Sequence, residues 1–425
     1  MDASLKRGPP RRPGLLVRVE TQCLGARWLG EVRALCVATG LAALLSAAAA
    51  QALGPTLEFY EGPVNSSQRV VGLGGAFAAV AEGAEAHLVN PAAFALRPLF
   101  AKKRWFDWDV GMSVFSGLGA SVNLDQNRLG ARADSARLSQ IGFNLKFGRL
   151  GVGFHMRSQD YALRVTPRER LPATFDLQQS FGGFGLAYAL GDGEWVLGTV
   201  MGLGTGQLSH SSGSAELRLG SPLGFHNFGF VHAPRGERWR IGGSLQLPVV
   251  LRPEDLQGDP VTPPETLGNR ATPGAILLPW QAAMGLAWMW GRRPLNQLPG
   301  YLEPAGSPSA VARDYVLATA DLVLTGPGNG AVGVQPYLAG LSAPIGRIGT
   351  PSVRAGVESE VLANRLVLRG GSYFEPSRYQ GSLGRVHATG GADVRLTWGW
   401  DWRITWCFDI AQGYVNSAFG LGLWH

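Results

Sequence analysis

The chain has 425 residues, of which 45% are hydrophobic and only 16% are charged, and it holds 60 glycines and 13 tryptophans. Soluble domains carry about 25% charged residues, so this composition argues against an ordinary soluble domain. It favours a transmembrane β-barrel, in which strands alternate and rims carry aromatic residues; a soluble all-β protein is the alternative. The net charge is +7, of which residues 1–34 supply +4, and the scattered remainder excludes a nucleic-acid-binding patch.

The first predicted element is a secretory leader. Residues 33–52 begin with an arginine, continue with an apolar core over Leu35–Leu45 and end with small residues suited to cleavage at Ala50 or Ala52. The apolar run is too short and too rich in alanine for a membrane span, although a single anchor helix is the alternative. We therefore predict an N-terminal extension and signal peptide over residues 1–52.

The cysteines limit the chemistry further. Cys23 and Cys36 lie in the leader, so Cys407 is the single thiol of the mature chain. One thiol allows neither an intramolecular disulfide nor a cysteine-based zinc site.

A small, apolar, glycine-rich stretch follows the leader. Residues 67–95 read SQRVVGLGGAFAAVAEGAEAHLVNPAAFA, which predicts helix and turn. Its Gly-Leu-Gly resembles the start of a dinucleotide-binding fingerprint, but Phe77 stands where the third glycine should be. Pro91 also interrupts the chain where the next strand of such a fold would run. The stretch is therefore not interpreted as a nucleotide site.

After residue 100 the chain consists of runs of eight to fifteen residues that alternate between apolar and polar positions. In the first run Trp108 and Val110 fall on one face, while Asp107 and Asp109 fall on the other. The polar faces mix Gly with scattered Asp, Arg, Asn and His, which suits a packed, partly wet barrel interior. The expected strands cover 104–114, 140–147, 152–157, 178–190, 193–206, 222–232, 238–247, 278–290, 313–324, 352–361, 364–374, 386–398, 401–410 and 415–424, with weaker candidates at 116–124, 214–220 and 331–341.

Tryptophans and loops add to this pattern. Most tryptophans lie near the start or end of a run, which predicts interfacial belts. Residues 251–275 and 292–312 are rich in proline and polar residues and predict two long loops. Long loops belong on one side of such barrels and tight turns on the other.

Three segments together carry a family resemblance. The glycine-rich stretch contains Arg69, then Gly-Gly-Ala-Phe from Gly74 to Phe77, then Asn-Pro-Ala from Asn90; the other two segments are LLPWQAAMGLAW at 277–288 and LVLRGGSYFEPS at 366–377. With these motifs the chain resembles the FadL/TodX family of outer-membrane transporters for hydrophobic compounds and its PorV-like relatives. The resemblance implies a fourteen-stranded barrel with an N-terminal plug.

The expected organisation follows from the strand pattern and the resemblance together. Residues 1–52 are the N-terminal extension and signal peptide, 53–100 the plug (hatch) segment and 101–425 the barrel. The fold class is all-β, a transmembrane antiparallel β-barrel of about 14 strands with a short N-terminal helical plug. The expected location is the outer membrane of a Gram-negative bacterium.

The resemblance implies passive uptake of hydrophobic compounds such as fatty acids or hydrocarbons. Phe77 and the turn at Asn90-Pro91 would shape or gate a pocket, and a gating segment should have few polar ties. The implied partners are a hydrophobic small molecule or lipid, outer-membrane lipid and lipopolysaccharide. The alternative is a PorV-like secretion or assembly partner that docks through its long loops. The candidate residues of the plug and substrate path are Arg69, Gly74, Gly75, Phe77, Asn90 and Pro91.

No catalytic residue, cofactor or metal site is predicted. The histidines are dispersed and suit hydrogen bonding better than metal binding. Ser209 and His210 are neighbours in sequence, which is not the spatial arrangement that a nucleophile and its base need. Asp107 and Asp109 are expected to pair with interior arginines. The candidates for that pairing are Arg157, Arg240, Arg354 and Arg403.

Overall fold

The computed structural model describes residues 54–59, 62–96, 105–116, 123, 125–126, 135–165, 173–210, 216–267, 270–291, 294–296, 315–396 and 402–423. The predicted leader, most of the weak strand candidate at 116–124 and most of the loop at 292–312 lie outside these residues. Among the residues described, no helix is long and apolar enough to cross a membrane.

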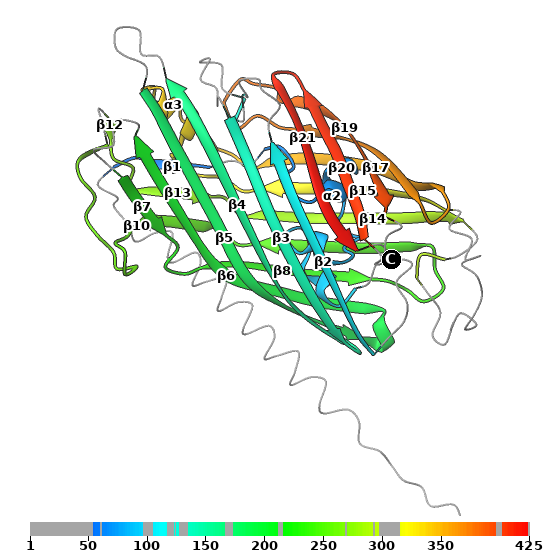
Figure 1. Ribbon diagram of the computed structural model, residues 1–425. Helices are drawn as coiled ribbons and strands as arrows, with labels where there is room; N and C mark the ends of the chain where they lie inside the picture. Colours follow the sequence, from blue (N-terminus) through cyan, green and yellow to red (C-terminus); the bar gives the residue numbers. More distant parts are fainter. Residues whose placement is uncertain are drawn as a thin grey trace, which may run out of the picture. The chain divides into compact units, whose positions relative to one another are not determined.

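Fourteen antiparallel strands close into a barrel (Figure 1), which confirms the predicted fold class. Each strand pairs with the next, and the last strand pairs back onto the first from Gly111–Gly422 to Ser116–Ser417. The strands are β2 (Phe106–Ser116), β3 (Ser135–Phe147), β4 (Leu150–Val165), β5 (Ala173–Leu190), β6 (Trp195–His210), β8 (Phe225–His232), β9 (Trp239–Gln246), β14 (Gln281–Gly291), β15 (Tyr315–Thr325), β17 (Thr350–Leu362), β18 (Leu366–Glu375), β19 (Arg385–Arg395), β20 (Trp402–Ala411) and β21 (Tyr414–Leu423).

Along β5 the apolar side chains change from the inner face of the wall to its outer face. In its second half Phe184 and Leu186 face outward and are exposed, while Ala187 faces inward and is buried. In its first half the polar Gln178 faces outward and the apolar Leu177 is buried inside. Side chains alternate with a period of two, so the same outward positions change from polar to apolar along one strand. On β5 an outward apolar band therefore covers only the half of the strand that ends at Leu190.

The two rims differ. Trp195, Trp239 and Trp402 begin β6, β9 and β20, and Trp290 lies one residue before the end of β14, so these residues gather at one rim, the tryptophan rim. The opposite rim, where β6 ends at His210, is called the loop rim. The tryptophan rim matches the predicted aromatic belt on one side of the barrel.

The two proline-rich segments leave the barrel at opposite rims, so the expectation that they share a side is wrong. The 251–275 segment precedes β14 and the 292–312 segment follows it. A single strand crosses the wall once, so connections on either side of it lie at opposite ends. Part of 251–275 is also regular structure, in β10 (Val249–Pro253), β11 (Thr266–Leu267), β12 (Arg270–Ala271) and β13 (Ala275–Leu278).

The N-terminal strand is built into the loop rim. β1 (Thr56–Glu58) pairs in parallel with β13 and with β16 (Val332–Gly333), and β13 pairs with β10, which pairs with β7 (Glu216–Gly220). Pro248 lies between β9 and β10, and Pro279 lies between β13 and β14. The strands are interrupted at these positions because proline has no N–H to donate to the hydrogen-bond ladder of a central strand. The rim therefore closes only with the chain segment that directly follows the predicted leader.

The strand predicted weakly at 331–341 is a two-residue strand followed by a five-residue helix, which corrects that prediction. After the two-residue β16, α3 (Val334–Leu338) begins behind an extended Gly333. Pro336 lies in the first turn, where its missing N–H would have no helical partner in any case. All five residues of α3 are buried, so the apolar character that suggested a strand serves packing instead.

The barrel interior holds the short helices that the sequence predicted in the plug. They are α2 (Gln68–Gly72), η1 (Ala84–Ala86) and η2 (Pro91–Phe94), whereas η3 (Gly191–Gly193) is a turn of the wall. One hydrophobic cluster joins β1 and α3 to the inner faces of β5 and β6. A second cluster joins α2 and the chain around Phe77 to β15, β18 and β20.

Candidate functional site

Residues 62–96 fill the barrel interior, and nearly all of them are buried. We call this segment the plug. Ser67 caps α2 by accepting a hydrogen bond from the amide of Val70 at 3.4 Å. Asn90 caps η2, and Pro91 occupies the first position of that helix, where proline is preorganised. Local capping signals thus fold both ends of the plug.

The glycine pair of the motif permits close contact with the wall. Gly74 and Gly75 have φ of 64° and 76°, which a side chain would strain. A Cβ on Gly74 would lie 2.7 Å from the carbonyl oxygen of Ala355 on β17. The wall also lacks side chains at this contact, because a Cβ on Gly356 or Gly371 would lie 2.4 Å from backbone atoms of the plug.

A second seat receives the far end of the plug. The ring of Phe94 lies so close to β5 that a Cβ on Gly185 would come within 1.8 Å of it, and a Cβ on Gly153 within 2.6 Å. Gly198 on β6 leaves room for Pro91 in the same way. These wall glycines are not among the site residues that the sequence predicted. The signal that could have found them is the repeated glycine at every second, inward position.

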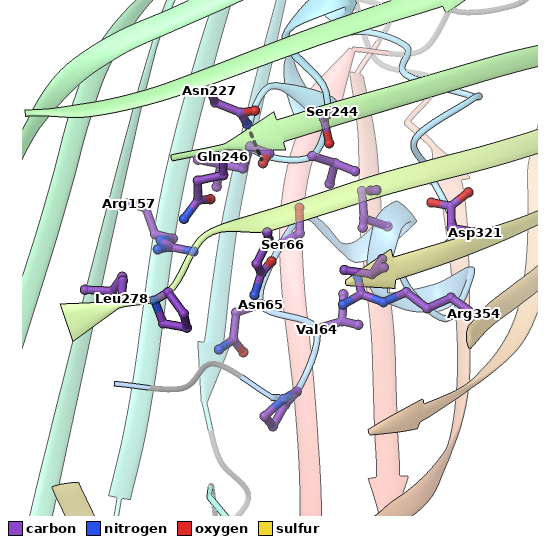
Figure 2. A pocket seen from close by; sticks show the side chains of 18 of the residues that line it. Val64, Asn65, Ser66, Arg157, Asn227, Ser244, Gln246, Leu278, Asp321 and Arg354 are labelled. Carbon is purple, nitrogen blue, oxygen red and sulfur yellow. Dashed lines mark hydrogen bonds between the residues drawn. The ribbon is translucent and has the colours of Figure 1, made fainter. Parts of the chain in front are cut away.

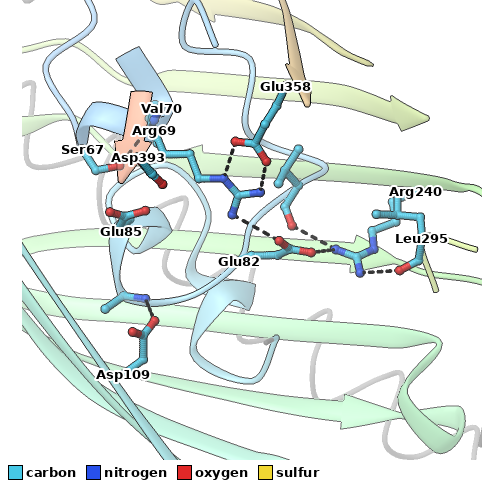
Figure 3. A network of polar contacts seen from close by, with 12 residues as sticks. Ser67, Arg69, Val70, Glu82, Glu85, Asp109, Arg240, Leu295, Glu358 and Asp393 are labelled. Atoms are coloured by element: carbon cyan, nitrogen blue, oxygen red, sulfur yellow. Dashed lines mark hydrogen bonds and ion pairs between the residues drawn. The ribbon is translucent and has the colours of Figure 1, made fainter. Parts of the chain in front are cut away.

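Arg69 is the centre of a buried ionic network (Figure 3). Its guanidinium binds Glu358 of β17 through two contacts of 2.9 and 2.8 Å, and binds Glu82 of the plug at 3.2 Å. Glu82 in turn binds Arg240 of β9 at 2.7 Å. Arg69 also stacks over the ring of Phe77, 5.2 Å from its centroid. Through Glu82, this plug arginine connects β17 with β9, two wall strands that β14 and β15 separate.

The network continues along the wall and returns to the plug. Glu358 also binds Arg369 of β18 at 2.9 Å, and Arg369 binds Asp393 of β19 with contacts of 2.6 and 2.7 Å. Asp393 binds Arg403 of β20 at 2.9 Å, and Arg403 binds Glu85 of the plug at 2.8 Å. The network thus holds four arginines and four carboxylates, so its charges balance.

Burial sets the charge of the plug's own ionisable groups. Burial alone would lower the pKa of Arg69, but Glu358 and Glu82 outweigh it and raise that pKa well above its usual value. His87, stacked on Phe94 at 3.8 Å between ring centroids, has no such acidic partner at contact distance. Burial lowers the pKa of His87 to about 3, so this ring is neutral near pH 7.

Wall carboxylates also hold the plug backbone. One oxygen of Asp321 on β15 accepts hydrogen bonds from the amides of Phe77 and Ala78, both at 2.8 Å. Asp109 on β2 accepts one from Ala84 at 2.8 Å. The amide of Asn90 donates to the carbonyls of Ala78 and Phe230 at 2.7 and 3.0 Å. The expectation of few polar ties is therefore wrong, because buried backbone and charge must find partners.

A second polar cluster binds the start of the plug. His387 lies between Asp409 and Glu375, at 2.7 Å from each. Tyr373 donates to Asp409 at 2.6 Å and accepts from the amide of Val64 at 3.1 Å. His387 therefore serves hydrogen bonding, as the sequence predicted for the histidines. Within the described part of the chain, no group of three or more His, Cys, Asp or Glu is arranged to hold a metal ion.

A cavity of about 110 Å³ lies between the plug and the wall (Figure 2). Its lining comes from the plug around Val64–Ser66 and Leu88, and from β4, β8, β9, β13, β14, β15 and β17. None of the six residues predicted for the plug and substrate path is part of this lining. The structure brings those six together inside the plug, where they fold it and fix it to the wall.

The sequence matches no protein-family model and no curated protein. Solved structures do match. A FadL homologue of Pseudomonas aeruginosa aligns at 12% identity and a TM-score of 0.53, over 84% of this chain and 98% of that one. The Pseudomonas putida toluene transporter TodX aligns at 12% identity and 0.51, over 87% and 98%. The monoaromatic hydrocarbon channel CymD aligns at 12% and 0.50, over 85% and 97%. This chain therefore has the fold of the FadL/TodX channels, as its motifs predicted.

Proposed function

We propose that this chain is an outer-membrane channel of a Gram-negative bacterium for passive uptake of hydrophobic compounds such as fatty acids or hydrocarbons. The observation that carries the proposal is a closed fourteen-stranded barrel whose interior is filled by a tied plug, in the fold of channels described as transporting toluene and other monoaromatic hydrocarbons. The outward apolar band and the tryptophan rim suit a lipid bilayer. Outer-membrane lipid and lipopolysaccharide would then surround the wall.

The plug gives the proposed channel its closed state. Its ties are ionic and hydrogen-bonded rather than covalent, so a rearrangement can exchange them. The cavity beside Val64–Ser66 is the site where a compound would first meet both plug and wall. Its occupation would compete with the contacts that hold the plug and so couple binding to passage.

Deletion of residues 67–95 tests the plug. The shortened barrel should show higher single-channel conductance in planar bilayers, because the segment fills the interior. Unchanged conductance would contradict the assignment of this segment as a plug. Membrane fractionation with heat-modifiable gel mobility should accompany the measurement and show that the shortened barrel has folded.

Uptake of labelled compounds by whole cells tests whether the chain carries hydrophobic compounds. Cells of a Gram-negative host without a channel of its own should take up labelled hexadecane and oleate faster when they produce this chain. A barrel that is folded and inserted but gives no increase for either compound would refute the proposal.

One observation favours a second candidate, a PorV-like secretion or assembly partner. In the loop-rim halves of β5 and β6 the wall is polar outside and packed with apolar residues inside, as in Leu177, Leu208 and the neighbouring Leu219, so that this part resembles a filled scaffold. A filled scaffold suits the docking of a protein. In that case uptake of neither compound would respond to changes in the plug.

A further inference from the structure

The cavity beside the plug is polar on several sides, which an apolar cargo does not require. Asn227, Ser244 and Gln246 line it from β8 and β9, and Asp321 and Arg354 line it from β15 and β17 (Figure 2). A site for a hydrocarbon is expected to be mostly apolar, with few polar groups. The polar groups of this cavity therefore indicate which hydrogen-bonding groups the bound compound must carry.

Two acceptors at the cavity lack partners. Asn227 is 5% exposed, and its amide nitrogen donates to the carbonyl of Leu88 at 3.4 Å, while its oxygen has no hydrogen-bond partner. One oxygen of Asp321 is occupied by plug amides, and its other oxygen has no partner. Both groups can accept hydrogen bonds, so a compound that satisfies them must carry donors.

Other groups at the cavity can donate. The hydroxyl of Ser66 is buried without a partner and can both donate and accept. Arg354 is the register neighbour of Asp321, and its Nε has no partner. A guanidinium only donates, so the same compound must also carry acceptors.

The apolar lining gives the compound a second requirement. Phe59, Val64, Leu278 and Val323 share the cavity with the polar groups, and apolar surface favours a hydrocarbon portion. A compound that meets both linings is therefore amphipathic, with a compact polar end and an apolar remainder.

We infer that the cavity binds the polyhydroxylated headgroup of an amphiphile, such as a glycerol or sugar headgroup, through Asn227, Ser66 and the Asp321–Arg354 pair. A hydroxyl both donates and accepts, so several hydroxyls satisfy all four residues. A carboxylate headgroup would satisfy Arg354 but give Asn227 no donor and face the charge of Asp321. A hydrocarbon would leave every one of these groups unpaired. The inference rests on the proposed uptake function and specifies its cargo.

Three labelled probes with one chain length test this inference on the full chain in nanodiscs. They are 1-O-dodecylglycerol, dodecanoate and dodecane, and equilibrium binding is measured for each. We expect dodecylglycerol to bind at least tenfold more tightly than dodecanoate. Ser66→Ala and Asn227→Leu should each weaken dodecylglycerol binding by about tenfold and leave dodecane binding unchanged, because each removes one of the unpaired groups.

Gln159→Leu is the matched control. Gln159 is also a buried interior amide with unpaired atoms, but it does not line the cavity, so its replacement should not change the binding of any probe. Heat-modifiable gel mobility shows which variants fold. If Asn227→Leu does not fold, the smaller change Ser66→Ala still tests the site.

The outcomes separate this inference from the proposed function. The headgroup site would be overturned if dodecanoate bound as tightly as dodecylglycerol or more tightly, or if neither cavity variant had an effect. The proposed uptake of apolar compounds would not be contradicted by these results. Binding of none of the three probes would overturn both.

Discussion

Replacement of Glu82 by glutamine should loosen the plug. Glu82 accepts from Arg69 at 3.2 Å and from Arg240 at 2.7 Å, and its side chain is fully buried. It is therefore the carboxylate through which the plug arginine and the β9 arginine are joined. Glu82→Gln keeps the size of the side chain but removes its charge and one of its two acceptor oxygens.

The magnitude follows from the charge count. Four arginines face four carboxylates, so the variant leaves one positive charge uncompensated. Removal of one partner from a buried ion pair costs about 3–5 kcal/mol. Arg69 keeps both contacts to Glu358 and Arg240 keeps its contact to Asn296, so we expect the lower end, about 3 kcal/mol. That shifts the equilibrium from a seated to a displaced plug by roughly 10²-fold.

Single-channel recording in planar bilayers measures this shift as an increased frequency and duration of high-conductance openings. Glu216→Gln is the matched control, because its pair with Arg218 has side chains that are 43% and 46% exposed, and such pairs contribute about 0–1 kcal/mol. The double variant Glu82→Gln/Arg240→Gln restores the charge balance. It should lie closer to the wild type than Glu82→Gln alone, since the two sites are in contact and their effects are not additive.

Openings of Glu82→Gln indistinguishable from those of the wild type would refute the reasoning, provided that the variant is folded. So would a double variant that opens as often as the sum of both single changes predicts. Either result would mean that the network does not hold the plug in place.

Three further predictions concern the seat, the neutral histidine and the N-terminal strand. Gly185→Val should prevent stable seating of Phe94, because a Cβ there would lie 1.8 Å from the ring, and heat-modifiable folding should fall; Gly182→Val, whose Cβ would meet nothing closer than 4.0 Å, should fold normally. Below pH 6.5 the unfolded chain binds a proton that buried His87 does not, since its pKa is lowered to about 3. Stability should therefore fall with decreasing pH, by up to about 1.4 kcal/mol per pH unit from this group. His87→Phe should show a shallower decline in unfolding experiments at pH 7 and pH 5, and an equal decline would contradict the assignment. Arg378→Met removes the buried 2.6 Å ion pair to β1, so limited proteolysis should cleave the N-terminal segment faster; unchanged cleavage would show that strand pairing alone holds it.

The loop-rim side of the wall suggests how the plug is supported. β5 carries exposed Phe184 in one half and buried Leu177 in the other, at positions of opposite parity. Lipid favours apolar side chains outside, whereas water favours them inside. The hydrophobic cluster beneath the loop rim therefore packs the interior at that end of the barrel.

Much of the fold could be predicted because barrel strands repeat with a short local period. The run at 152–157 lies in β4, residues 386–395 of the run at 386–398 lie in β19, and the plug motif identified the segment that fills the interior. The helix at Val334–Leu338 was missed, since a buried five-residue helix and a buried strand have similar composition. The change of parity within β5 falls at Gly182 and Gly183, between Phe181 and Phe184, where two glycines carry no apolar or polar side chain to mark it.

The family resemblance implied the plug, and the sequence by itself determined the alternation of the strands, hence an all-β barrel, together with the tight turns of Gly74 and Gly75 and the caps at Ser67 and Asn90. These features depend on residues within a few positions of one another, so local physics decides them. Only the tertiary structure decided which charges meet. Arg69 and Glu358 are 289 positions apart, and their pairing arises when the barrel closes and removes water from both groups, so that each must find the other.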